Sequence, residues 1–148
     1  MISCLYGTIL FSIHEINIPE QQWNNLIPNI FQIYESGSDE KRLQVLRLFQ
    51  NIFVETKDML SEYAPNFQKL FDLTINHQNL LIKLESINTL LQSIISLKPA
   101  VIKNFKIFIP QIFCQLNEVI EKKDEQWLEK LMEKVLNICQ NKPSFFKK

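Results

Sequence analysis

Apolar residues recur along this chain at steps of three and four, which is the spacing of one face of an α-helix. The pattern predicts an isolated helix at 1–17, followed by three helical pairs at 20–55, 58–96 and 99–141. Within the pairs, polar residues interrupt the apolar pattern and mark the ends of helices. A serine or aspartate of Ser36-Gly37-Ser38-Asp39 is expected to cap one second helix, and Asp124 another, because serine and aspartate accept hydrogen bonds from the first free amides of a helix.

A short phrase marks the first helix of each pair: two apolar residues, a proline, an amide and another apolar residue. Its copies are Leu26-Ile27-Pro28-Asn29-Ile30, Tyr63-Ala64-Pro65-Asn66-Phe67 and Phe108-Ile109-Pro110-Gln111-Ile112. The prolines are 37 and 45 residues apart, and a period of about 40 residues with two helices each is typical of HEAT or armadillo repeats. The sequence therefore predicts an all-α fold, an α-solenoid of HEAT-like helical pairs with about three and a half repeats and seven helices.

Two explanations account for the repeated proline. A proline inside a helix removes a backbone hydrogen bond and bends the helix, whereas a proline at the start of a helix costs nothing. Because the apolar stripe begins several residues before each proline, we expect a bent first helix, with the helix start as the alternative.

Composition supports one folded domain. The chain has 148 residues, of which 46% are hydrophobic and 22% charged, so it can bury a core and is not typical of a disordered chain. It has only two glycines and no Asn-Gly or Asp-Gly pair, which argues against a fold rich in β-hairpins. Trp23 is expected in the core, and Trp127 either in the core or against a neighbouring molecule.

The cysteines and the first residues indicate the compartment. Cys4, Cys114 and Cys139 are far apart and form no CxxC motif, so we expect three reduced, buried thiols in a cytosolic or nuclear protein. The apolar run at 5–13 has no basic residue before it and ends at His14 and Glu15. We therefore expect neither a secretory signal nor a membrane span.

The net charge is zero, which gives no indication of general nucleic-acid binding. The charges are nevertheless unevenly distributed. Residues 1–74 carry 5 basic and 9 acidic side chains, and residues 75–148 carry 11 and 7. This difference has two explanations, an ordinary solvated surface or a partner that recognises an acidic patch.

Catalytic chemistry is not expected from this sequence. The two histidines, His14 and His77, have no cysteine, serine or carboxylate at a useful local spacing. There is no nucleophile elbow, glycine-rich phosphate loop or metal-ligand cluster. We therefore predict no enzyme activity, no cofactor and no metal site.

The polar side chains of the second helices are the candidate binding residues. They face away from the apolar stripes and offer acids and amides to a partner lying along a concave surface. The alternative is that they are ordinary solvated residues or members of local ion pairs. The set is Arg47, Asn51, Glu85, Thr89, Gln92, Glu129, Glu133 and Asn137.

Several phrases resemble importin-β-type nuclear transport receptors of the karyopherin-β superfamily. The resemblance is carried by Gln22-Trp23-Asn24-Asn25-Leu26-Ile27-Pro28, by Ser38-Asp39-Glu40-Lys41-Arg42, by residues 105–112, and by Asp124-Glu125 with Leu128-Glu129-Lys130-Leu131-Met132-Glu133. It covers about residues 20–148 and is closest to the subgroup that carries ribosomal proteins and histones.

The resemblance implies a HEAT-repeat segment in nuclear import, found in the cytoplasm and the nucleus. Its partners would be proteins: basic cargo, nucleoporin repeats and, in a full-length receptor, the GTPase Ran. Such receptors are several times longer, so we expect an interior segment, and no Ran-binding residue is assigned. The alternatives are a HEAT-repeat scaffold outside nuclear transport, of the phosphatase or coat-complex type, or a truncated remnant without independent activity.

Overall fold

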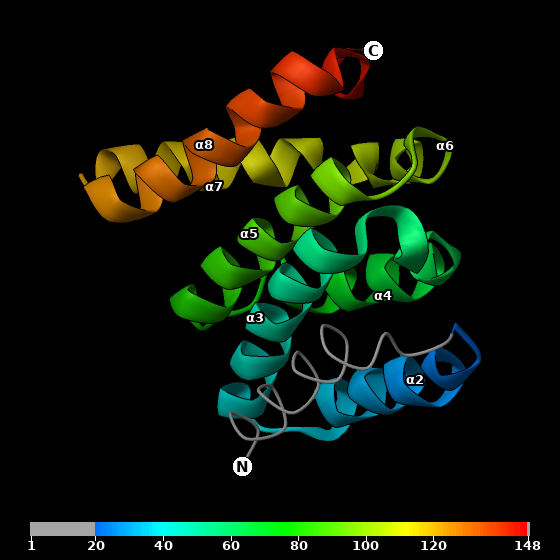
Figure 1. The fold of residues 1–148 in the computed structure, drawn as a ribbon. Helices are drawn as coiled ribbons and strands as arrows, with labels where there is room; N and C mark the ends of the chain where they lie inside the picture. The colour runs from blue at the N-terminus through cyan, green and yellow to red at the C-terminus, as the bar shows by residue number, and fades with distance from the viewer. Residues whose placement is uncertain (1–19, 148) are drawn as a thin grey trace.

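The computed structural model describes residues 20–147, and the side chains of residues 27–55 and 60–147. The helix predicted at 1–17 and the predictions for the Trp23 and Cys4 side chains lie outside this part. Every regular element in the described part is helical (Figure 1). The prediction of an all-α helical-repeat solenoid is confirmed.

The elements follow one another as three helical pairs. In the first, α2 (Glu20–Ser36) is followed by α3 (Asp39–Thr56). The second contains the 3-10 helix η2 (Lys57–Tyr63), α4 (Ala64–Thr74) and α5 (Leu80–Ser96). The third contains α6 (Pro99–Ile102), η3 (Lys103–Phe108), α7 (Ile109–Glu121) and α8 (Glu125–Asn141), and a last 3-10 turn, η4 (Pro143–Phe146), follows it.

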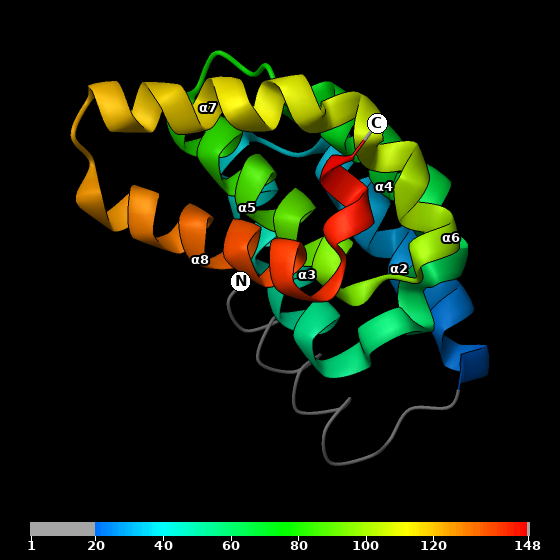
Figure 2. The same cartoon turned by 90° about the horizontal axis from the view of Figure 1, so that it is seen from above.

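The helices form two layers. The second helices α3, α5 and α8 lie side by side in one layer, and the first helices α2, α4 and α7 form the other (Figures 1 and 2). Consecutive second helices make the most extensive contacts, with α5 packed between α3 and α8. The middle helix α5 is therefore covered on two sides as well as by its own first helix.

Side-chain caps explain where the second helices begin. The Ser38 hydroxyl accepts a hydrogen bond from the Lys41 amide at 3.4 Å, and the Asp124 carboxylate accepts one from the Trp127 amide at 3.2 Å. Both caps are as predicted. Asn79 caps α5, since its side-chain oxygen accepts from the amides of Leu81 (3.0 Å) and Ile82 (3.4 Å). Each cap satisfies amides that have no partner inside the helix.

The repeated prolines occupy two kinds of position. Pro28 lies inside α2, as the bent-helix explanation requires. Pro65 and Pro110 instead lie in the first turn of α4 and α7, so at these two positions the alternative is correct. The apolar stripe that precedes each of them runs through a 3-10 helix, and the proline marks the change to α-helix, where its missing amide costs no hydrogen bond.

A column of phenylalanine rings joins the three pairs. Phe67 lies at its centre, with its ring centroid 5.0 Å from that of Phe31 and 4.8 Å from those of Phe49 and Phe53. The column continues through Phe71 to two rings of η3, Phe105 at 5.9 Å and Phe108 at 6.1 Å. All seven rings are buried, so the core runs continuously from α2 to the third pair.

The outer faces of α7 and α8 differ from the prediction. Cys114 and Cys139 are exposed, so the expectation of buried thiols is wrong for both. Phe113 and Leu136 fit the apolar spacing of three and four that predicts buried helix faces, yet they are 46% and 53% exposed. The neighbours of α7 and α8 cover a narrower face, which includes Ile112, Leu116, Leu131 and Ile138.

Trp127 is half-buried and packs against the core. The Lys130 ammonium lies 4.8 Å from the centre of its ring.

Among the helices described, none is both long and apolar enough to cross a membrane.

Candidate partner-binding surface on the second helices

The predicted binding residues all lie on the layer of second helices, but not all of them are accessible. Asn51 on α3 and Glu129, Glu133 and Asn137 on α8 are exposed, and Gln92 on α5 is half-buried. Arg47 on α3 is exposed as well. The expectation of an outward-facing side chain is wrong for two residues of α5, because Glu85 is 5% and Thr89 0% exposed.

Glu85 is buried because α3 packs directly over it. Its carboxylate accepts hydrogen bonds from the Arg47 guanidinium at 2.5 Å and from the Gln50 amide at 3.3 Å. The Thr89 hydroxyl accepts from the same Gln50 amide at 3.0 Å and donates to the Glu85 carbonyl at 2.7 Å. A charge out of water is tolerated only when it is paired in this way.

The network continues to α8. The Asn88 amide donates to the Gln50 side-chain oxygen at 3.2 Å, and the Lys134 ammonium donates to the Asn88 side-chain oxygen at 2.6 Å. Burial lowers the pKa of Lys134, while the Glu85 and Glu133 carboxylates oppose this change. We call this set, which links all three second helices, the polar seam: Arg47, Gln50, Glu85, Asn88, Thr89 and Lys134.

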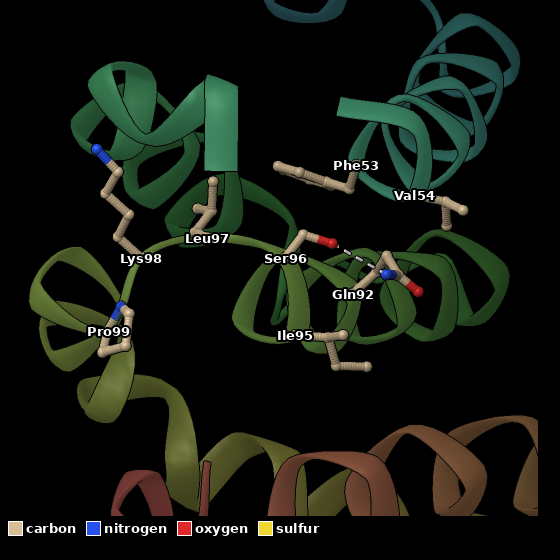
Figure 3. Close-up of a pocket in the computed structure, with 8 residues that line it drawn as sticks. All are labelled: Phe53, Val54, Gln92, Ile95, Ser96, Leu97, Lys98 and Pro99. Atoms are coloured by element: carbon tan, nitrogen blue, oxygen red, sulfur yellow. Dashed lines mark hydrogen bonds between the residues drawn. The ribbon is translucent and has the colours of Figure 1, made fainter. Parts of the chain in front are cut away.

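A groove lies between the carboxyl ends of α3 and α5 (Figure 3). This α3–α5 groove has a volume of about 540 Å³ and is lined by Phe53 and Val54 of α3 and by the stretch 95–99 together with Gln92. The Gln92 amide group donates to the Ser96 hydroxyl at 3.1 Å. Its carbonyl oxygen has no hydrogen bond within the described residues, so the groove offers an acceptor beside an apolar surface.

A second groove lies between α5 and α8. This α5–α8 groove has a volume of about 280 Å³ and is lined by Gln92, Ile95, Glu133, Lys134 and Asn137. Because both grooves include Gln92 and Ile95, they form one surface across the three second helices. The fold therefore brings together three of the predicted residues, those at positions 92, 133 and 137.

The remaining candidates lie outside both grooves. Asn51 donates to the Arg47 carbonyl at 2.9 Å within its own helix, and Glu129 lies nearer the start of α8. Arg47 belongs to the polar seam.

Sequence reasoning missed the other residues of the grooves, namely Phe53, Val54, the stretch 95–99 and Lys134. Phe53 and Ile95 fit the apolar spacing that predicts core residues, yet each of them also lines a groove. Val54 lies outside the apolar face of α3 and is 58% exposed. An apolar side chain at a position that should be polar could have indicated that it belongs to a binding surface. Nothing in the local sequence marks Lys134.

The grooves combine apolar side chains with amides, one carboxylate, that of Glu133, and two ammonium groups, those of Lys98 and Lys134. This composition suits recognition of a peptide segment by shape and distributed polar contacts. Within the part of the chain that the structure describes, no three histidine, cysteine or acidic side chains lie close enough together to hold a metal ion. His77 has a local role, because its ring accepts a hydrogen bond from the Asn79 amide at 2.9 Å.

A family model described as "IPO5-like, TPR repeats" matches residues 13–148. The match covers all three helical pairs and both grooves. Neither a curated protein nor a solved structure matches the chain.

Proposed function

Because this chain belongs to the IPO5-like repeat family, and is an importin-β-type HEAT-repeat segment, we propose that it binds protein partners in nuclear import. The partner class is basic cargo, with nucleoporin repeats and Ran as further partners of a full-length receptor. The chain would act in the cytoplasm and the nucleus. The contiguous surface of the α3–α5 and α5–α8 grooves is the observation that supports this proposal.

The two grooves favour an extended partner. Their shared residues Gln92 and Ile95 offer a polar contact and an apolar contact next to each other, which an extended backbone with alternating side chains can use. The surface runs across consecutive second helices, so a partner would engage all three pairs. Repeat solenoids bind in this manner, along a continuous face rather than in one deep site.

The acidic side chains of α8 favour a basic partner. Glu129 and Glu133 are exposed one turn apart, and Glu133 lines the α5–α8 groove. The neighbouring Lys134 ammonium donates its hydrogen bond into the polar seam. Glu133 is therefore the carboxylate best placed to receive a lysine or arginine side chain of the partner.

The test is a binding titration with a fluorescent, lysine- and arginine-rich peptide. Glu133→Lys replaces an attraction with a repulsion in the groove, and we expect it to weaken binding roughly tenfold. Glu121→Lys is the matched control, because Glu121 is equally exposed but lies at the end of α7. It should change affinity by less than about twofold.

Equal losses in the two variants would show that only net charge matters, and would contradict a groove-specific site. Addition of Ran with GTP to a complex formed by the full-length receptor should release the cargo. A fixed partner whose binding ignores Ran would instead point to a scaffold outside nuclear transport.

A further inference from the structure

The acidic residues are absent from two long stretches of the second half of the chain. Residues 86–117 contain no aspartate or glutamate but include Lys98, Lys103 and Lys106. Residues 134–148 likewise contain none but include four lysines. The fold places these two stretches together, because η3 contacts η4 and both lie at the carboxyl end of α8 (Figure 2).

A cavity of about 230 Å³ opens where the two stretches meet. Lys103 and Lys106 of η3 and Lys142 after α8 line it, and Ile102 and Phe145 supply apolar walls. Among the described residues that line this cavity, none carries a carboxylate. Its electrostatic potential is therefore positive, unlike that of the α5–α8 groove with its carboxylate.

The three lysines differ in how their ammonium groups are used. Lys142 donates to the carbonyls of Ile94 (2.8 Å), Ile95 (2.9 Å) and Leu97 (2.6 Å) at the end of α5. This contact fixes one positive charge at the cavity. It also explains Lys142 by itself, because a cation at a helix carboxyl end is stabilising.

Lys106 is only partly used in the same way. Its ammonium donates to the carbonyls of Ser144 at 3.0 Å and Lys147 at 2.9 Å, so one of its three hydrogens remains for another acceptor. The side chain of Lys103 is exposed and makes no hydrogen bond or ion pair within the described residues. Contacts within the fold therefore account for Lys142, account only in part for Lys106, and do not account for Lys103.

We propose that this cavity binds an anionic side chain of a protein partner, a carboxylate or a phosphorylated residue. Lys103 and Lys106 would donate hydrogen bonds to the anion, and Lys142 would supply a fixed charge. The cavity accommodates a single anionic group, and its apolar walls fit the carbon chain that bears it. The α3–α5 groove shares Pro99 with this cavity, so a partner lying in that groove could extend an acidic residue into it.

The test is a titration of the ¹⁵N-labelled full chain, followed through the backbone amides of residues 102–106 and 144–146. The probes are inorganic phosphate, phosphoserine and a glutamate-rich peptide, and we expect saturable shifts at these amides. Phosphoserine binding more tightly than the glutamate peptide would assign the phosphorylated source, and the reverse would assign the carboxylate.

Lys103→Gln should weaken binding of the tightest probe about fivefold to tenfold, since charge-assisted hydrogen bonds are lost. Lys122→Gln is the matched control, because it removes the same charge from an exposed site at the far end of α7; it should leave affinity within about twofold. The Lys103 side chain makes no hydrogen bond or ion pair within the described residues, so its replacement should not change the thermal unfolding midpoint.

Three results would overturn the proposal. The first is the absence of saturable shifts around the cavity, and the second is an equal loss of affinity in the two variants. The third is tighter binding of a short single-stranded DNA, with shifts spread over the whole basic half, because this would show a diffuse electrostatic surface rather than a site for one side chain.

Discussion

Gly37 lies where the backbone passes closely over itself between α2 and α3. A Cβ atom at this position would lie 2.5 Å from the Ile33 carbonyl oxygen and 3.0 Å from the Lys41 Cβ. The first of these is a backbone atom, which moves only if the link between the helices moves. Gly37 is therefore required by space and not by a special backbone dihedral angle.

We expect Gly37→Ala to lower the free energy of unfolding by about 1–3 kcal/mol, the usual cost of overpacking. Urea denaturation monitored by circular dichroism would measure it. Ser36→Ala is the control, because it changes the neighbouring residue and removes only an exposed hydrogen bond to the Gln32 carbonyl. A loss of similar size in both variants would contradict the steric explanation.

Tyr34 makes the free energy of unfolding depend on pH in the alkaline range. Its side chain is 1% exposed, and burial raises its pKa from 10.0 to about 12, with Thr74 and Arg42 opposing the rise. Between these two values the unfolded chain loses the phenol proton while the folded chain keeps it. The contribution of Tyr34 to the free energy of unfolding is therefore fully present below pH 10 and is lost as the pH rises through 12.

The expected loss between pH 10 and pH 12 is about 2–3 kcal/mol, from about 1.4 kcal/mol per pKa unit. Urea denaturation at a series of pH values would measure it. Other groups also titrate in this range, so the comparison is with Tyr34→Phe, in which the slope should be smaller by this amount. Identical slopes in the two proteins would contradict the assignment.

At the scale of the helix, Glu85 is the central acceptor of the polar seam. Removing its carboxylate by Glu85→Ala leaves the Gln50 and Asn88 amides without one acceptor each and leaves Arg47 without its ion pair. Because one partner of a buried pair is lost, we expect the free energy of unfolding to fall by about 3 kcal/mol.

Guanidinium denaturation would measure this loss, and Glu129→Ala, at an exposed position of α8, should cost less than about 0.5 kcal/mol. Glu85→Gln keeps an acceptor and should recover part of the loss. If all three variants were equally stable, the polar seam would contribute nothing to folding.

The sequence predicted the helices better than it predicted their faces. Periodicity was sufficient for the helical elements, and serine and aspartate before an apolar stripe were sufficient for the caps at Ser38 and Asp124. Glu85 and Thr89 were misplaced because α5 has neighbours on both sides. A polar residue off the apolar stripe faces water only when one side of the helix is covered.

The same argument explains why two cysteines that were expected to be buried are exposed. Cys114 and Cys139 fall near the edges of the stripes of α7 and α8, where a few tens of degrees of rotation separate core from surface. Which side of the edge a residue takes depends on the neighbouring helix, and the local sequence does not contain this information. Likewise the α3–α5 groove arises from the ends of α3 and α5, and the α5–α8 groove from the facing sides of α5 and α8, which meet only after folding.

At the scale of the molecule, the column of phenylalanine rings couples the three pairs. Phe67 contacts rings of α2 and α3 and, through Phe71, is connected to η3. We expect Phe67→Ala to lower the free energy of unfolding by about 3–5 kcal/mol. Because the column crosses every pair, the loss should reduce protection in all three pairs.

Native-state hydrogen exchange would test this, with faster exchange expected in α3, α5 and α8 together. Phe113→Ala is the control, since this ring is 46% exposed and its removal should cost less than about 1 kcal/mol. Faster exchange confined to α4 would contradict coupling through the aromatic column and would favour independent unfolding of the pairs.

The polar seam also means that the three pairs are not interchangeable modules. Asn88 needs a glutamine on the preceding second helix and an ammonium on the following one. A solenoid joined only by apolar contacts could accept a duplicated or reordered pair at moderate cost, whereas here a carboxylate and an amide would be buried without partners. The side chains of the polar seam thus specify the order of the pairs. A substitution in the part of α5 that belongs to the seam would have to be matched by changes in both neighbouring repeats.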